Sequence, residues 1–292
     1  MEDMKMSEIN NAQRAQVLVE ALPYIQKYYG KVIVVKYGGN AMINEELKHD
    51  VMRDMVLMHL IGVKVVLVHG GGPEISSMLK RVGKESKFVD GLRVTDEETS
   101  EIVQMILAGK INKSLVAKLD NLGGRAMGIC GMDGGLIKAE MIDERLGYVG
   151  EIKKINPQPI LDLLEKGYIP VVSTIGCDET GHVYNINADT AAAAIAASLH
   201  AESLISMTDT VGLLMDPSDP DTLIRRIDLN GVEELKAQGV ISGGMIPKVD
   251  CCTKAIQEGV RKVFIIDGRV PHALLLETLT DEGAGTMFKK EI

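Results

Sequence analysis

The stretches VIVVKYGG (residues 32–39) and VKVVLVHGGGP (residues 63–73) decide the fold prediction. Each is a β-branched apolar run that ends in consecutive glycines. Because residues on both faces of such a run are apolar, each is typical of a strand in a parallel sheet that helices cover on both sides. Pro73 follows the second cluster, and proline at a first helical position marks a helix start. We therefore predict two buried strands that lead into glycine loops.

Strands and helices alternate on both sides of these stretches. We predict helices at 11–28 (kinked or restarted at Pro23), 44–62, 74–82, 95–107, 111–122, 159–166, 189–199, 232–238, 247–258 and 271–279. We predict strands at 32–35, 63–68, 169–173, 203–207 and 262–266, and short strands between 126 and 152 with hairpin turns at Gly134, Gly135 and Gly147. This alternation predicts an α/β fold, a three-layer αβα sandwich around a mainly parallel central sheet, with an extra N-terminal helix. Two lobes that share one sheet, residues 1–198 and 199–292, are the best division.

Composition excludes several classes of protein. A chain of 292 residues that is 46% apolar can bury a sizeable core. The net charge of -9 argues against a general nucleic-acid-binding protein. We expect no signal peptide and no membrane span, because the first residues are polar and the apolar runs are short. Four scattered cysteines lack metal-ligand spacing, so we expect a reduced, cytoplasmic protein without a metal site of its own.

Glycine clusters occupy the positions where open α/β sheets bind ligands, outside the carboxyl ends of strands. They are Gly38-Gly39, Gly70-Gly71-Gly72 and Gly243-Gly244. Glycine lets backbone N–H groups approach an oxyanion, and a helix N-terminus adds about half a positive charge. One such cluster is as well explained by a tight turn, but three at equivalent positions favour anion binding. A P-loop, a dinucleotide fingerprint, a serine-hydrolase elbow and a zinc-protease motif are all missing.

Two lysines and an aspartate are candidates for chemistry on an anion. Lys36 closes the first strand, and Lys248 should lie at the start of its helix, after Gly243-Gly244. Each lysine alone is more often a solvated surface residue. Asp189 begins an alanine-rich helix, where an acidic side chain also complements the helix dipole, and Asn187 could be the cap. Locally, capping and catalysis are equally good explanations of Asp189.

Taken together, these segments resemble the amino acid kinase family, and within it the members that phosphorylate N-acetyl-L-glutamate in arginine biosynthesis. The matching segments run in order along the whole chain: VKYGG (35–39), VHGGGP (68–73), DGLRVT (90–95), YNINAD (184–189), TDTVG (208–212) and GGMIPK (243–248). The glycine clusters are shared widely in the family. The segments around Arg93 and Asn185 are much more specific.

The resemblance implies a role for each candidate residue. Lys36 and Lys248 would stabilise the transferring phosphoryl group, and Asp189 would orient both lysines. Arg93, Asn185, Gly71 and Gly72 would bind N-acetyl-L-glutamate in the N-terminal lobe, which would also carry the dimer contact. The resemblance implies ATP with Mg²⁺ as the phosphoryl donor. The residues along its phosphates and nucleotide would be Gly38, Gly39, Gly70, Asp209, Gly212, Leu214, Gly243, Gly244 and Met245.

Elementary chemistry agrees with these roles. The acceptor carboxylate has a pKa near 4 and is ionised at pH 7, so it needs no general base. The difficulty is charge, since two unit charges about 4 Å apart repel by roughly 4 kcal/mol at an effective dielectric of 20. Two lysines, backbone N–H groups and Mg²⁺ can neutralise that charge. His69 has no proton to move in this reaction, so we expect it to be structural.

The resemblance also implies regulation. Arginine-inhibited, hexameric members carry an N-terminal helix that is interlaced between dimers, and the helix predicted at 11–28 matches it. Their arginine-site signature resembles HALLLE (272–277) with GAGT (283–286). The resemblance thus implies feedback inhibition by arginine at His272, Glu277 and Gly285 of the C-terminal lobe and Tyr24 of the N-terminal helix. It also implies a homohexamer built as a trimer of dimers. It leaves open a PII-type signal protein as a partner, which some relatives bind.

Three alternatives remain at this stage. Another kinase of the same family is the nearest, but aspartokinase-like and glutamate 5-kinase-like chains usually carry extra domains. Carbamate or uridylate kinases would lack the substrate segment around Arg93. A non-catalytic, arginine-responsive binding module would not need Lys36, Asp189 and Lys248. A dinucleotide oxidoreductase is disfavoured by its missing glycine fingerprint.

Overall fold

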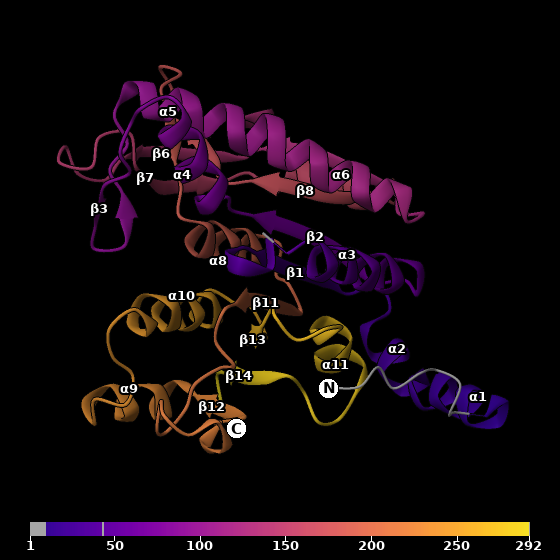
Figure 1. Ribbon diagram of the computed structural model, residues 1–292. Helices are drawn as coiled ribbons and strands as arrows, with labels where there is room; N and C mark the ends of the chain where they lie inside the picture. The colour runs from indigo at the N-terminus through magenta and orange to yellow at the C-terminus, as the bar shows by residue number, and fades with distance from the viewer. Residues whose placement is uncertain (1–9, 43, 292) are drawn as a thin grey trace.

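A computed structural model describes residues 10–42 and 44–291, and its core is one large sheet (Figure 1). The strand order is β12-β14-β13-β11-β1-β2-β8-β5. Their bounds are β1 Val32–Tyr37, β2 Lys64–His69, β5 Ala126–Cys130, β8 Ile169–Ser173, β11 Ser203–Thr208, β12 Arg226–Asp228, β13 Lys262–Asp267 and β14 Gly285–Lys289. The neighbouring strands are parallel except for the pair β13 and β14. The prediction of a mainly parallel sheet is confirmed.

Helices cover both faces of this sheet because its strands are apolar on both faces. Ile33 and Val35 point into one core and Val34 into the other. The first core is closed by α3 (Glu45–Leu60), α6 (Asn112–Asn121) and α11 (Ala273–Leu279). The second is closed by α7 (Gln158–Glu165), α8 (Ala188–Ser198) and α10 (Met245–Gln257). Helices α4 (Gly72–Arg81) and α9 (Leu229–Ala237) extend the two layers. The predicted three-layer sandwich is therefore confirmed.

The chain continues through the sheet from one lobe to the other. Strand β11 pairs in parallel with β1, so the segment after residue 198 rejoins the centre of the sheet built by the first half. In Figure 1 the strands β2 and β8 lie above, the orange and yellow C-terminal segments lie below, and the first two helices of the chain lie at the lower right. The predicted division between residues 198 and 199 falls just before β11.

A smaller sheet, with two antiparallel strand pairs and one parallel pair, lies in the upper half of the molecule (Figure 1). It holds β10 (Val183–Asn185), β9 (Ile175–Cys177), β6 (Ile137–Met141) and β7 (Gly150–Ile155), and a separate hairpin joins β3 (Phe88–Val89) to β4 (Leu92–Arg93). Gly147 lies in the connection between β6 and β7, as predicted. The hairpin predicted at Gly134 and Gly135 is wrong. These glycines form a 3-10 turn, η3 (Asp133–Gly135), that carries the chain from the large sheet into the small one.

The two helices predicted at 95–107 and 111–122 form one continuous helical segment. Helix α5 (Glu97–Gln104) passes into a π-helix, η2 (Met105–Ile111), which continues into α6. The expected break near Gly109 is therefore absent. A π-helix changes the direction of the side chains that follow it without ending the helix, and such segments are frequent at functional sites.

The N-terminal helix is divided at Pro23, as predicted. Helix α1 (Asn11–Glu20) begins with a capping box between Asn10 and Gln13, and α2 (Leu22–Tyr28) restarts with Pro23 in its first turn. Figure 1 shows α1 projecting from the body at the lower right. Leu18 is 74% exposed, and Val17 and Val19 are also mostly exposed. Among the described residues, no helix is both long and apolar enough to cross a bilayer.

Some of the segments that connect strands contain short 3-10 turns. The turn η1 (Gly39–Met42) follows β1 directly, and η4 (Pro220–Thr222) lies in the turn-rich segment before β12. The ends of β1, β2 and β11 lie side by side because the three strands are parallel neighbours. The segments that follow these strands therefore meet at one edge of the sheet.

Candidate active site

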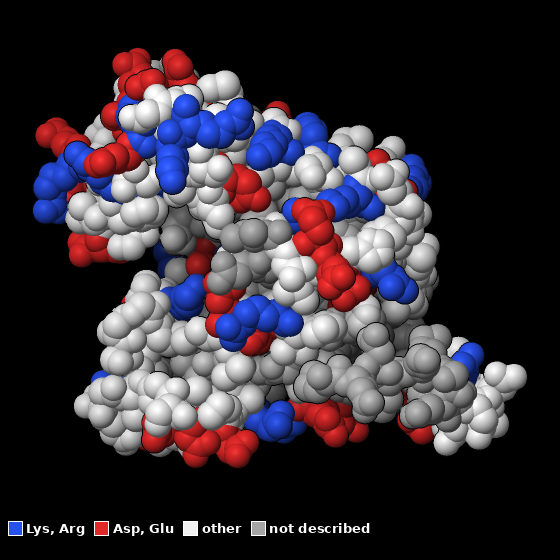
Figure 2. Space-filling view, viewed as in Figure 1, with Lys and Arg blue, Asp and Glu red and all other residues white. Residues whose placement is uncertain are grey.

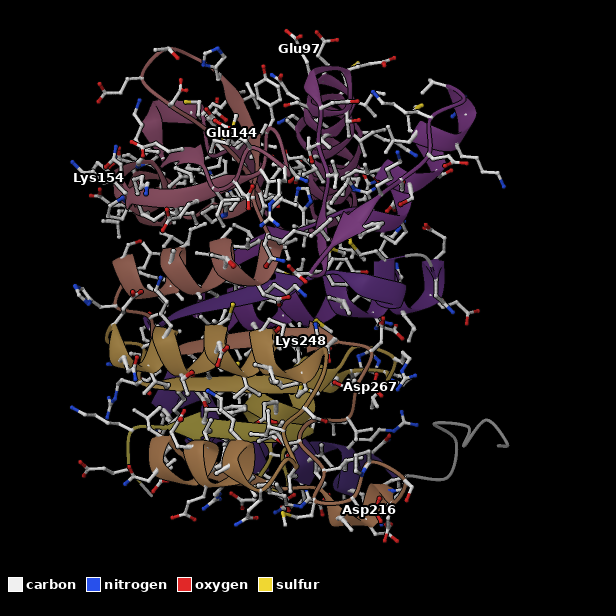
Figure 3. All side chains as sticks on the ribbon, turned by 90° about the vertical axis from the view of Figure 1, so that its left-hand side faces the viewer. Glu97, Glu144, Lys154, Asp216, Lys248 and Asp267 are labelled. Atoms are coloured by element: carbon white, nitrogen blue, oxygen red, sulfur yellow. The ribbon has the colours of Figure 1, made fainter. Side chains whose placement is uncertain are left out.

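Asp189 joins the two candidate lysines. Its Oδ1 lies 3.0 Å from Nζ of Lys36 at the end of β1, and its Oδ2 lies 3.7 Å from Nζ of Lys248 in the first turn of α10. Figure 2 shows the molecule hollowed on the left, between its upper and lower halves, and Figure 3 places Lys248 at the height of this hollow. Three charged groups from distant parts of the sequence thus meet between the lobes.

The structure shows that Asn187, and not Asp189, caps helix α8, and the catalytic role of Asp189 stays a prediction. Asn187 is the N-cap of α8, and its side chain accepts hydrogen bonds from the backbone N–H groups of Asp189 and Thr190. The Asp189 carboxylate contacts the lysines and is not needed for capping. Burial alone would raise the pKa of Asp189, but the charges of Lys36 and Lys248 hold this pKa below its ordinary value. The group is therefore a permanent carboxylate at neutral pH.

The first two glycine clusters surround this ion pair. A Cβ built on Gly38 would be 3.5 Å from Nζ of Lys36, so the loop backbone lies beside the ammonium group. Gly39 has a φ of +72°, and a Cβ there would lie 2.8 Å from Oδ1 of Asp209. A Cβ on Gly70 would lie 3.2 Å from Cβ of Ala188, at the start of α8. Close backbone approach therefore accounts for glycine at Gly39 and Gly70, whereas a Cβ on Gly38 would make an ordinary contact.

A cavity of about 180 Å³ opens beside the loop at Gly70–Gly72, and it brings the predicted substrate residues together. Arg93 and Asn185 line it together with Gly71 and Gly72. The buried Arg93 guanidinium donates hydrogen bonds to the carbonyl of Gly72 (3.0 Å), to Oγ of Ser76 (2.8 Å) and to Oγ of Ser86 (2.7 Å). Its orientation is therefore fixed before any ligand arrives.

The π-helix supplies part of the cavity wall that sequence reasoning missed. Leu107 lines the cavity, and Leu107 and Ile111 both pack against Gly71. A Cβ on Gly71 would lie 2.7 Å from Cδ2 of Leu107 and would overlap Cδ1 of Ile111. The sequence offered no signal for this contact, because the predicted helices at 95–107 and 111–122 do not include the π-helix that joins them.

We expect Gly71→Ala to destabilise the protein. The added methyl group overpacks two buried side chains, and overpacking costs about 1–3 kcal/mol. Chemical denaturation should show a lower free energy of unfolding, partly restored by Ile111→Val in the double variant. Gly72→Ala is the matched control for stability, since a Cβ at that position meets no heavy atom of the described chain within 4 Å apart from its chain neighbours and the backbone of its own helix. Equal stability of the Gly71→Ala variant and the wild type would contradict this packing.

His69 lies in a buried hydrogen-bond network, which supports the structural role predicted for it. It is fully buried at the end of β2, where Nδ1 lies 2.9 Å from the carbonyl of Gly70 and Nε2 lies 3.3 Å from Nδ2 of Asn112. Burial lowers the pKa of His69 to about 4, so the ring is neutral at pH 7. Asn112 also donates to the carbonyl of Val171 on β8. This network ties the glycine loop to α6 and to the sheet.

The lowered pKa of His69 predicts acid sensitivity. Below about pH 6.5 the unfolded histidine takes up a proton that the native one takes up only near pH 4, so acid favours unfolding. At about 1.36 kcal/mol per pKa unit, this proton uptake lowers the free energy of unfolding by roughly 3 kcal/mol between pH 7 and pH 4. Urea titrations at pH 7 and pH 4 measure how far the free energy of unfolding falls between the two pH values. We expect this fall to be about 3 kcal/mol smaller in His69→Gln than in the wild type. The same drop in both proteins would contradict the assignment.

The other residues expected along the nucleotide, from Asp209 onward, lie on the C-terminal side of the cleft. Asp209 follows β11 and faces Gly39 of the first loop. Gly212 has a φ of +135°, and a Cβ there would lie 2.6 Å from Oγ1 of Thr286. Leu214 forms an isolated antiparallel bridge with Leu223. Gly243, Gly244 and Met245 form the turn into α10, and Gly243 has a φ of +54°. Their nucleotide roles stay predictions.

A second cavity, of about 310 Å³, lies between α2 and the C-terminal lobe. Tyr24, Glu277 and Gly285 line it, as the resemblance implies. Glu277 accepts a hydrogen bond of 2.7 Å from the backbone N–H of Ala284, and burial raises the pKa of Glu277. His272 lies elsewhere, with Nδ1 2.6 Å from Oδ1 of Asp54 on α3. The role of His272 in arginine binding stays a prediction.

Sequence comparison gives the same family for most of the chain. A model described as the amino acid kinase family matches residues 31–267. The chain is 55% identical over 288 residues to the acetylglutamate kinase of Brachyspira hyodysenteriae, covering 98% of this chain and 100% of that protein. It is 54% identical over 282 residues to the acetylglutamate kinase of Synechococcus elongatus, covering 96% and 94%.

Solved structures share the fold. An N-acetylglutamate synthase from Neisseria gonorrhoeae, complexed with coenzyme A and N-acetyl-glutamate, matches with a TM-score of 0.82 at 26% identity over 95% of this chain. This chain spans 64% of the length of the synthase. Carbamate kinase from Giardia lamblia bound to AMP-PNP matches with a TM-score of 0.65 at 17% identity, covering 90% of this chain and 99% of that one. At that identity the likeness shows the fold alone.

Proposed function

The chain belongs to the amino acid kinase family, and we propose that it transfers the terminal phosphoryl group of ATP to the side-chain carboxylate of N-acetyl-L-glutamate. The product would be N-acetylglutamyl 5-phosphate, an intermediate for arginine biosynthesis. The observation that carries the proposal is the Asp189 carboxylate, which lies within 3.7 Å of both Lys36 and Lys248 between the lobes. Relatives that are 51–55% identical over nearly the whole chain carry the name acetylglutamate kinase.

The geometry suits transfer between two anions. The acceptor carboxylate is already the nucleophile at neutral pH, and the obstacle is its repulsion from the phosphates. Lys36 and Lys248 approach from the two lobes and would neutralise the phosphoryl oxygens, where preorganised donors are most effective. Asp189 keeps the two ammonium groups close together before substrate arrives. Backbone N–H groups of the glycine loops would complete the charge stabilisation.

Mg²⁺ fits this site as a partner of ATP. Within the residues that the structure describes, no group of three or more His, Cys, Asp or Glu side chains is placed to hold a metal ion. Mg²⁺ is usually held by one or two carboxylates together with substrate phosphates. Asp209, whose carboxylate faces the loop at Gly39, is the residue we propose to help hold it. Bound Mg²⁺ would supply neutralisation of phosphate charge.

The cavity at Arg93 suits the amino-acid end of the substrate. A guanidinium forms a bidentate pair with a carboxylate, and the ring of Phe88 also stacks against it, 4.7 Å from Cζ. We propose that Arg93 binds the α-carboxylate, that Asn185 hydrogen-bonds the substrate, and that Gly71 and Gly72 face it. ATP would lie along Gly38, Gly39 and Gly70, and along Asp209, Gly212, Leu214, Gly243, Gly244 and Met245 in the C-terminal lobe.

The proposal is tested by measuring ADP formation from MgATP with four acceptors side by side. They are N-acetylglutamate, glutamate, aspartate and carbamate, and Lys36→Ala is the blank. We expect activity with N-acetylglutamate that is lost in Lys36→Ala. Activity confined to another acid would overturn the acceptor, and no activity with any of the four would favour a non-catalytic binding module.

We further propose that arginine inhibits this enzyme at the cavity of Tyr24, Glu277 and Gly285. The half-buried Glu277 carboxylate suits a guanidinium, and the cavity is also lined by Tyr28, which connects it to the N-terminal helices. We expect Glu277→Ala to raise the arginine concentration for half-inhibition by at least about tenfold, since a charge-assisted hydrogen bond contributes about 1.5–3 kcal/mol. Activity without arginine should be unchanged. Unaltered arginine sensitivity in the variant would overturn the site.

The exposed apolar residues of α1 support an oligomer. Val17, Leu18 and Val19 lie on a helix that buries none of its residues in the monomer. We propose a homohexamer, a trimer of dimers in which these helices pack between dimers, and light scattering of the purified protein measures the mass directly. The four unpaired cysteines are usual for a reducing compartment and support a cytoplasmic location.

A further inference from the structure

The carboxylate of Asp189 has a third partner besides the lysines, and it is neutral. The hydroxyl of Ser206 on β11 donates a hydrogen bond of 3.2 Å to Oδ1 of Asp189, the oxygen that also faces Lys36. Ser206 is 7% exposed, as is Lys36. Nothing in the local sequence SLISMT (203–208) distinguishes this serine from an ordinary strand residue. Its significance comes from its place beside the ion pair.

The sheet register places Ser206 beside Lys36. The two residues are paired on the parallel strands β11 and β1. Paired residues of neighbouring strands project to the same face of a sheet, so the hydroxyl and the ammonium group reach Asp189 from the same side. Both contact Oδ1, which leaves Oδ2 directed at Lys248, 3.7 Å away. The pairing of strands, rather than any loop, sets this arrangement.

A carboxylate that pairs with two cations through different oxygens needs a fixed orientation of its plane. The last torsion of an aspartate side chain is broad, so the carboxylate plane is not fixed by rotamer preference alone. Rotation of that plane would move one oxygen away from Lys36 and the other away from Lys248. A hydrogen bond to one named oxygen removes this freedom. We propose that Ser206 is a positioning residue that fixes the plane of the Asp189 carboxylate and thereby the spacing of the two lysines.

The same strand provides a matched control. Ser203 is also buried, at 1% exposed, but within the described residues its Oγ has no hydrogen-bond partner. It lies three residues from Ser206 and therefore on the opposite face of the strand. Removing the Ser203 hydroxyl takes away the same atoms from the same strand without touching Asp189. Any general effect of a serine-to-alanine change in β11 should appear in both variants.

The test compares kcat and KM of Ser206→Ala, Ser206→Thr and Ser203→Ala with those of the wild type. This inference rests on the proposed reaction, so the assay uses MgATP with N-acetylglutamate first and the other three acids after it. We expect Ser206→Ala to lower kcat about tenfold, with both KM values within about twofold. Ser206→Thr, which keeps the hydroxyl, should retain kcat within about threefold, and Ser203→Ala should match the wild type. Thermal unfolding of each variant checks that it folds.

The outcomes separate this inference from the proposed function. An unchanged kcat in Ser206→Ala, or an equal loss in Ser203→Ala, would overturn the positioning role while the reaction stands. A rise in KM alone would also overturn it, because the effect would then be on binding. If the wild type phosphorylates another acid, the proposed acceptor is wrong, and the same comparison of kcat on that acid decides the role of Ser206. If Ser206→Ala does not fold, a tenfold lower kcat in Ser206→Cys, a weaker donor of similar shape, supports the role, and a wild-type kcat there overturns it.

Discussion

Replacing Lys248 by alanine should lower kcat by about 10²–10³ with little change in the KM for either substrate. Removing one preorganised donor from a site of developing charge has typically that effect. Lys248 comes from the C-terminal lobe and reaches Asp189 across the cleft, opposite Lys36. Its loss leaves one ammonium group to neutralise a transferring phosphoryl group that carries charge on three oxygens. Steady-state measurement of ADP formation, with each substrate varied in turn, gives the result.

Lys254→Ala is the control for this prediction. Lys254 lies on the same helix but its side chain is 66% exposed, and its ion pair with Glu258 is long, at 3.8 Å. Exposed pairs of this kind contribute little to stability, and Lys254 is not one of the residues that we propose to contact the phosphates. The control should therefore keep the wild-type kcat. A loss in Lys254→Ala equal to that in Lys248→Ala would point to the helix and not to the ammonium group. A large rise in KM for ATP with an unchanged kcat would contradict a transition-state role.

Replacing Arg93 by alanine should lower kcat/KM for N-acetylglutamate by about 10²–10³. Loss of one partner of a buried, hydrogen-bonded charge pair costs about 2–5 kcal/mol, and a 10²–10³-fold effect corresponds to about 2.7–4.1 kcal/mol, in the middle of that range. The KM for ATP should stay within about threefold, because Arg93 lines the cavity beside Gly70–Gly72 and not the nucleotide side. Arg93→Lys should recover only part of the loss, since lysine keeps the charge but not the planar fork.

The guanidinium of Arg93 also hydrogen-bonds to Gly72, Ser76 and Ser86. A control must therefore separate the loss of these hydrogen bonds from the loss of substrate binding. Ser86→Ala removes one of these three hydrogen bonds and leaves the charge in place. We expect Ser86→Ala to lower kcat/KM by no more than about tenfold. A similar loss of kcat/KM in Ser86→Ala and Arg93→Ala would mean that the hydrogen bonds within the protein, and not substrate binding, account for most of the effect. An unchanged kcat/KM in Arg93→Ala would contradict substrate binding by this residue.

The central strands could be predicted because their composition is unambiguous. Runs such as Val32–Val35 and Val63–Val68 are apolar on both faces and β-branched, which leaves few alternatives to a buried parallel strand. The outer elements carry no such signal. Strand β14 (Gly285–Lys289) begins with a glycine and pairs antiparallel with β13, and β3 and β4 contain two residues each. Long-range pairing with β13 creates β14. In contrast, β3 and β4 pair locally across the two-residue turn Asp90-Gly91, a short hairpin signal that the element prediction did not use.

The site was predictable only in part, for a similar reason. Lys36 and Lys248 drew attention because lysine is unusual at a buried strand end and at a helix start. The meeting of both with Asp189 depends on the parallel pairing of β1 and β11 and on the placement of α10. Ser206 and Leu107 gave no sequence signal, since a serine in a strand and a leucine in a helix are ordinary. Their positions follow from sheet register and from the π-helix.

The most direct test of the central claim is identification of the phosphorylated product. The protein is incubated with MgATP and N-acetylglutamate in the presence of hydroxylamine, which converts an acyl phosphate to a stable hydroxamate. We predict formation of the hydroxamate on the side-chain carboxyl group, in equal amount to ADP, and its absence with Lys36→Ala. ADP formation without any hydroxamate would contradict transfer to a carboxylate.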